Sequence, residues 1–110
     1  MKIDTEEQAN SINLGDASVI GILWQNDSRD LALHLELNSG AVGILTCIWF
    51  TNLRIDLDFK ELSESLTWDV RFTRSDKQIW HVEFDFAGAP DGVLELDCND
   101  MTFEETNCER

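Results

Sequence analysis

Two histidines, His34 and His81, are the residues best suited to acid–base catalysis near neutral pH. Each stands at a polar position of an alternating segment, so we expect each side chain to face water or a neighbouring carboxylate. His81, for example, shares its strand face with Glu83. No serine lies in a G-x-S-x-G elbow, and the chain has neither of the glycine-rich loops that bind nucleotide phosphates. The sequence therefore predicts no catalytic residues.

Three cysteines, Cys47, Cys98 and Cys108, are the other residues with reactive or metal-binding potential. Their odd number and the lack of a C-x-x-C pair argue against a disulfide framework and favour free thiols in the cytoplasm. Cys98, Cys108 and His81 lack the paired spacing of a zinc site, and the acids near Asp91 lack the calcium-loop pattern. We therefore expect no metal and no cofactor. Cys47 lies in an apolar run and is expected to be buried.

The chain has 22 acidic and 8 basic residues, for a formal net charge of −14. This charge disfavours nucleic acid and anionic membranes as partners, and no apolar run approaches the roughly 20 residues of a membrane span. Many acids alternate with apolar residues, which places them together on outer strand faces. The candidate partner-binding acids are Asp56, Asp58, Asp69, Glu83, Asp85 and Glu95. Asp27 and Asp30 are expected in an exposed turn away from them.

Two explanations of these outer acids remain open. They keep a small sheet protein soluble and its edges unpaired, or they meet a basic protein and accelerate its association. Trp49 is out of phase with Ile48 and Phe50, so it either serves as an exposed partner-binding anchor or is buried by a second layer. Trp68 and Trp80 are in phase with apolar neighbours and are expected in the core.

An alternation of apolar and polar residues with a period of two dominates the chain and predicts an all-β protein. The expected strands are 17–24, 31–37, 42–50, 53–59, 66–72, 80–86, 93–98 and 101–103. The first two form one hairpin, and the fifth and sixth form another. The nearly continuous apolarity of 42–50 indicates a central strand covered on both faces. Asp4 and Glu7 have capping-box spacing, so a short helix is possible within 4–14.

The length of 110 residues corresponds to a single domain, 1–110. Seven or eight antiparallel strands fit either a sandwich or one strongly curved sheet, and we favour the sandwich. The core is expected to contain Leu33, Leu35, Leu57, Trp68, Val70, Val82 and Phe84. The sequence does not predict the strand order or the oligomeric state.

The segment Gly15–Ile22, followed by a hairpin and by strands with one polar face that end in Gly92–Cys98, resembles small acidic β-rich immunity proteins of bacterial polymorphic toxin systems. The resemblance covers 15–104, with Gly15 where those proteins often have histidine. It implies a cytoplasmic protein that binds and blocks a cognate toxin, without catalytic residues. We therefore favour a non-enzymatic, immunity-like inhibitor that presents an acidic surface to a basic partner protein. The alternative is a small-ligand or metal-binding β domain, including an enzyme that uses His34 or His81.

Overall fold

A computed structural model describes residues 2–12, 14, 17–56, 66–87 and 92–106, with the backbone alone for 66–68 and 87. These residues form nine strands and one short helix, which confirms the all-β prediction. The elements are β1 (Lys2–Ile3), α1 (Glu6–Asn10), β2 (Ser18–Gln25), β3 (Asp30–Glu36), β4 (Val42–Ile48), β5 (Thr51–Asp56), β6 (Leu66–Arg74), β7 (Trp80–Ala87), β8 (Gly92–Cys98) and β9 (Asp100–Thr106).

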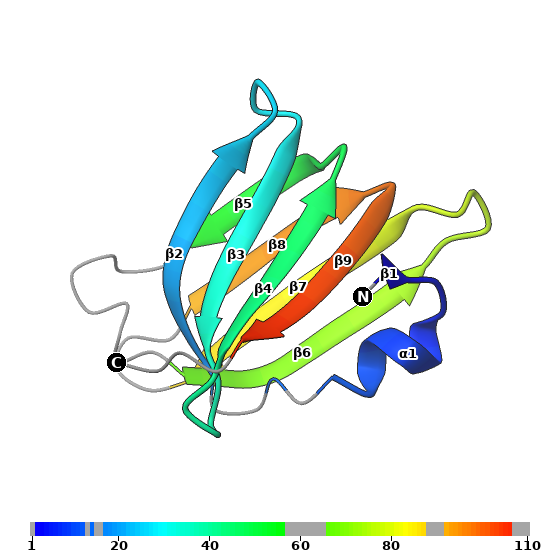
Figure 1. The fold of residues 1–110 in the computed structure, drawn as a ribbon. Coiled ribbons are helices and arrows are strands. Elements are labelled where there is room, and N and C mark those ends of the chain that lie inside the picture. Colours follow the sequence, from blue (N-terminus) through cyan, green and yellow to red (C-terminus); the bar gives the residue numbers. More distant parts are fainter. Residues whose placement is uncertain (1, 13, 15–16, 57–65, 88–91, 107–110) are drawn as a thin grey trace.

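The strands form two antiparallel layers packed face to face (Figure 1). One layer has five strands in the order β1-β9-β4-β3-β2, and the other has four in the order β6-β7-β8-β5. Hydrogen bonding continues from one layer to the other where Ser18 of β2 pairs with Leu66 of β6. The architecture is therefore the expected sandwich, made from a sheet that folds over at this corner.

The chain passes between the layers at two points that lie side by side. β2 pairs with β3 and β6 with β7, so both expected hairpins are confirmed. The chain changes layer between β4 and β5 and again between β8 and β9. At these crossings the backbone N–H of Asn99 donates to the carbonyl oxygen of Ile48 at 2.9 Å. The last two strands, β8 and β9, thus belong to opposite layers.

The core lies between the layers and consists of their inward-facing residues. Four of the expected core residues are fully buried, namely Leu33, Leu35, Val82 and Phe84. Trp80 is also fully buried, as its phase predicts, and Val70 is half-buried against the core. Each large apolar side chain buried in this way contributes about 1.5–3 kcal/mol. Leu57 and the side chain of Trp68 lie outside the described part of the chain.

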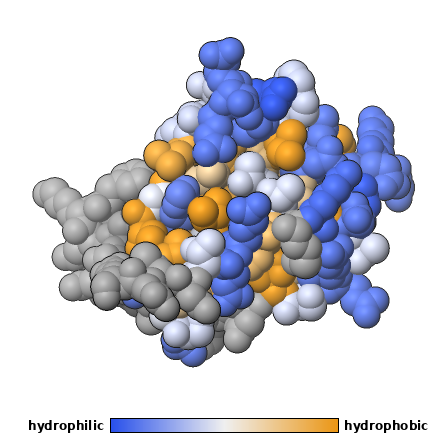
Figure 2. Space-filling model, in the orientation of Figure 1, coloured by the Kyte–Doolittle hydropathy of each residue, from blue (hydrophilic) through white to orange (hydrophobic). Residues whose placement is uncertain are grey.

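The β4 strand departs from the prediction that both of its faces are covered. It is central in its layer, and its inward residues Leu45 and Cys47 are fully buried. Its outward residues, such as Val42, Ile44 and Ile48, are only half-buried. Figure 2 shows hydrophobic residues between hydrophilic ones on this side of the molecule. The nearly continuous apolar run therefore corresponds to a central strand with one buried face and one half-buried face.

The N-terminal helix is present but begins at a different cap from the one expected. Thr5, not Asp4, is the N-cap, and its hydroxyl accepts a hydrogen bond from the backbone N–H of Gln8 at 3.1 Å. Oε1 of Gln8 in turn accepts from the Asp4 N–H at 2.9 Å. The short β1 strand was not predicted because two residues carry no periodicity, and only its pairing with β9 defines it. No helix in the described residues is long and apolar enough to cross a membrane.

Candidate functional site

The outer face of the four-stranded layer carries three rows of residues that run across its strands. From β6 through β7 and β8 to β5, the rows are Asp69-Asp85-Val93-Asp56, Arg71-Glu83-Glu95-Arg54 and Thr73-His81-Asp97-Thr51. Residues directly opposite one another share a face, and the residues between them in β7 and β8 point into the core. We define the acidic face as Asp56, Asp69, Glu83, Asp85, Glu95 and Asp97 with Arg54, Arg71 and His81.

The tertiary structure brings together five of the six acids predicted to bind a partner. Asp56 lies in the first row beside Val93, Asp69 lies opposite Asp85, and Glu83 lies opposite Glu95. Like charges placed directly opposite each other destabilise a sheet. The sixth acid, Asp58, lies outside the described residues.

Two arginines partly offset this repulsion, as cross-strand partners of the acids. Arg71 forms ion pairs with Glu83 and Asp85, and its Nη2 lies 2.9 Å from Oδ2 of Asp85. Arg54 Nη1 lies 3.4 Å from Oε1 of Glu95. Both guanidinium groups are exposed, so solvent screens these pairs and each contributes at most about 1 kcal/mol. The face keeps a strong excess of negative charge.

His81 lies in the third row, where carboxylates surround both of its ring nitrogens. Its Nδ1 is 2.7 Å from Oδ1 of Asp97, and its Nε2 is 3.9 Å from Oε1 of Glu83 and 3.8 Å from Oε2 of Glu95. Nδ2 of Asn52 donates to the other oxygen of Asp97 at 2.9 Å. Burial opposes ionisation of Asp97, but the hydrogen bonds from Asn52 and His81 and the charge of His81 hold its pKa below the usual range.

His81 lies on a polar strand face, as predicted, but its closest partner, Asp97, was not predicted. The sequence contains two pairs of polar residues at i, i+2 spacing that could have indicated this cluster, His81 with Glu83 and Glu95 with Asp97. Each pair places two side chains on one face of a strand. The register of β7 and β8 sets His81 opposite Asp97, and no local pattern encodes that register.

Trp49 lies at the β4–β5 crossing, two residues before Thr51, which ends the third row. Its side chain is 56% exposed, so of the two open alternatives the structure shows exposure. The Trp49 backbone has a φ of 55°, and the guanidinium carbon of Arg29 lies 4.9 Å from the centre of its ring. The indole is therefore displayed at the end of the acidic face and not within its rows.

Asp30 is not in an exposed turn, contrary to the prediction. It is 3% exposed and accepts hydrogen bonds from Nδ2 of Asn26 at 2.5 Å, from Nε of Arg29 at 3.0 Å and from the Trp49 backbone N–H. The hydrogen bond from Arg29 has the largest effect on the pKa of Asp30, and those from Asn26 and Trp49 add to it. Together they outweigh the effect of burial and lower this pKa to about 2. The turn residues Asn26 to Ser28 suggested exposure, but the crossing from β4 covers Asp30.

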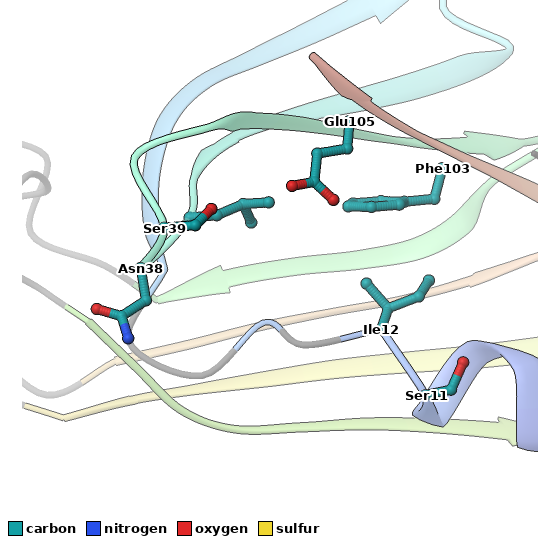
Figure 3. Close-up of a pocket in the computed structure, with 7 residues that line it drawn as sticks. Ser11, Ile12, Asn38, Ser39, Phe103 and Glu105 are labelled. Atoms are coloured by element: carbon teal, nitrogen blue, oxygen red, sulfur yellow. The ribbon is translucent and has the colours of Figure 1, made fainter. Parts of the chain in front are cut away.

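A pocket of about 510 Å³ opens elsewhere, between the end of α1, the β3–β4 turn and β9 (Figure 3). Its lining residues are Ser11, Ile12, Leu37, Asn38, Ser39, Phe103 and Glu105. Neither histidine is among them. His34 is half-buried on the outer face of β3, opposite Gly21. This pocket therefore does not combine a cavity with either of the candidate acid–base residues.

Comparison with known proteins bears on the fold alone. No protein-family model matches the chain. No curated protein matches it. Among solved structures, an uncharacterized protein from Neisseria gonorrhoeae is similar, with a TM-score of 0.59 and 14% sequence identity over 82% of this chain and 91% of that chain. A similar fold is therefore formed by a very different sequence.

Proposed function

We propose that this chain is a non-enzymatic binding protein that presents the acidic face to a basic partner protein. One observation carries the proposal: among the described residues, six carboxylates and only two guanidinium groups lie in register on one side of the four-stranded layer. Paired strands hold these charges at set spacings. A charged surface of this kind raises the rate of encounter with a partner of opposite charge and disfavours wrong partners.

The opposed acids favour binding over a purely solubilising role. Solubility is served by charges of both signs spread over a surface, whereas Asp69 opposite Asp85 and Glu83 opposite Glu95 cost stability. Proteins keep such local conflicts mainly at functional sites. A basic partner would relieve the repulsion on binding, so the same pairs that weaken the free chain would strengthen the complex.

The most concrete form of this proposal is an immunity-like inhibitor that acts in the cytoplasm and covers a basic site on a cognate toxin. The resemblance to immunity proteins and the excess of acidic residues support it. The buried free thiols of Cys47 and Cys98 fit a reducing compartment. The product of the adjacent reading frame is the first partner to test, because an immunity gene normally lies beside its toxin gene.

Two double variants with the same change in net charge test the acidic face. Asp56→Lys/Asp69→Lys alters two exposed residues of the acidic face, and Glu36→Lys/Glu104→Lys alters two exposed residues on the outer face of the other layer. Association rates with the partner are measured by stopped flow at low and physiological salt. We expect the first variant to associate on the order of tenfold more slowly at low salt and the second to change little.

Three results would contradict the proposal. An equal loss of rate in both variants would mean that only net charge matters, and a rate independent of salt would remove the steering argument. If the chain bound the partner without inhibiting its activity, the immunity role would be rejected. Circular dichroism and thermal unfolding of both variants verify that the reversals leave the fold intact.

A further inference from the structure

The contact between His81 and Asp97 determines which imidazole nitrogen carries the proton. An ionised aspartate only accepts hydrogen bonds, so Nδ1, at 2.7 Å from Oδ1 of Asp97, is the donor. In the neutral ring, Nε2 then holds a free electron pair. Asn52 holds the other Asp97 oxygen at 2.9 Å. A carboxylate behind a histidine is also the usual partner of a metal-binding imidazole, because it sets the tautomer and the ring orientation.

The two opposed glutamates each turn one oxygen toward this free electron pair. Nε2 of His81 lies 3.9 Å from Oε1 of Glu83 and 3.8 Å from Oε2 of Glu95. Arg71 and Arg54 hold the other oxygens, Oε2 of Glu83 and Oε1 of Glu95, from the two sides. Three electron-pair donors from two neighbouring strands therefore face one point. A cation placed there would stabilise all three.

We propose that Nε2 of His81, Oε1 of Glu83 and Oε2 of Glu95 bind one zinc ion, with Asp97 orienting the imidazole. Ligand atoms from these three residues lie within 4.8 Å of one another. Tetrahedral zinc with bonds of about 2.0–2.2 Å needs its ligand atoms about 3.3–3.5 Å apart. Each glutamate oxygen must therefore approach Nε2 by about half an ångström, and the two glutamate oxygens, which lie within 4.8 Å of each other, must approach by at most about 1.4 Å. Small torsions of the two glutamates supply this movement, and water takes the fourth position because the site opens to solvent.

The ligand types favour zinc over the common alkaline-earth ions. Imidazole is a good ligand for zinc, copper and nickel, whereas calcium and magnesium prefer sites made of oxygen alone. No metal was expected from the sequence, because the spacing of the cysteines with His81 does not fit a zinc site. The site proposed here arises instead from the register of β7 and β8. It is a property of the isolated chain and does not rest on the proposed binding function.

Calorimetric titration of the metal-free chain with zinc sulfate near neutral pH tests the site. All proteins carry Cys108→Ser, because a thiolate binds zinc strongly and would obscure the result. We expect one ion per chain and a loss of affinity on the order of tenfold or more for His81→Asn and for Glu95→Gln. His34→Asn is the matched histidine control and Asp56→Asn/Asp69→Asn the matched acid control. Both controls should stay within about twofold of the parent, because neither alters a ligand.

Three outcomes would overturn the proposal. An unchanged affinity in His81→Asn, or an equal loss in Asp56→Asn/Asp69→Asn, would indicate diffuse attraction to the acidic face. Calcium binding as tight as zinc binding would show that the imidazole is not a ligand. If a variant fails to fold, nitrogen-15 NMR spectra of the parent protein test the site instead. Zinc must shift the resonance of Nε2 of His81, and an unshifted resonance would overturn the proposal. Partner association measured with a chelator present tests the proposed function separately.

Discussion

The carboxylate of Asp30 accepts a hydrogen bond from the backbone N–H of Trp49, with 3.2 Å between Oδ1 and the nitrogen. A second link joins the same segments, because the Phe50 N–H donates to the carbonyl oxygen of Arg29 at 3.1 Å. These contacts tie the β2–β3 hairpin to the point where the chain leaves the five-stranded layer. A buried charge therefore helps to fix the β4–β5 crossing between the layers, where the Trp49 side chain is exposed.

Replacing Asp30 by asparagine should destabilise the fold. The new amide group would face the donors of Asn26 and Arg29, and the charge that they stabilise would be lost. Hydrogen bonds to a buried charged group contribute about 1.5–3 kcal/mol, so we expect the free energy of unfolding in urea to fall by about that amount. Asp27→Asn, an exposed change in the same hairpin turn, should alter it by less than about 0.5 kcal/mol. Similar values for the two variants would contradict this role of Asp30.

The stabilising effect of Asp30 should depend on pH. Its pKa is lowered from the ordinary 3.8 to about 2, so the folded state favours the carboxylate. The resulting stability is complete above the ordinary value and is lost as the pH falls toward the folded one. The difference in unfolding free energy between the parent and Asp30→Asn should therefore be constant above about pH 5 and shrink between about pH 4 and pH 2. The acidic face titrates in the same way in both proteins, so its contribution cancels in this difference. A difference that did not change with pH would refute the prediction.

Gly43→Ala should overpack the core near the pocket. A Cβ atom on Gly43 would lie 2.8 Å from Cζ of Phe103 and 3.3 Å from Cδ2 of Leu37. Overpacking of this kind costs about 1–3 kcal/mol. Gly21→Ala is the matched control, because its Cβ would meet His34 Cβ at an ordinary 3.6 Å. In thermal unfolding, Gly43→Ala should have a lower melting temperature than Gly21→Ala. Equal melting temperatures would show that the Phe103 side chain moves aside without loss of stability.

The thiols of Cys47 and Cys98 should react slowly in the native protein. Both are buried, and Cys47 lies on the five-stranded layer while Cys98 lies on the other. A hydrogen bond with Cys98, together with burial, raises the pKa of the Cys47 thiol, which leaves little of the reactive thiolate. In Cys108→Ser, a chromogenic disulfide reagent should therefore find two thiols only after unfolding. Rapid reaction of two thiols in the folded state would contradict the burial, and their absence after unfolding would reveal a disulfide.

The period-two alternation was enough to predict eight of the nine strands and the inward residues of several of them, and the turn residues between the strands marked both hairpins. This follows because successive side chains of a strand point to opposite faces, so a local pattern encodes the face that each residue occupies. Trp80 and Phe84 were correctly placed in the core for this reason, and Glu83 and Asp85 on the outer face. The two-residue β1 strand is too short to show a period.

Strand order and register were decided only by the tertiary structure. A local pattern gives the face of His81 but not its neighbour on the next strand, so the contact with Asp97 and the opposition of Glu83 and Glu95 could not be predicted. The burial of Asp30 has the same origin, since the chain that covers it arrives from β4. Burial and pairing depend on packing between segments distant in sequence, whereas alternation depends only on the geometry of one strand.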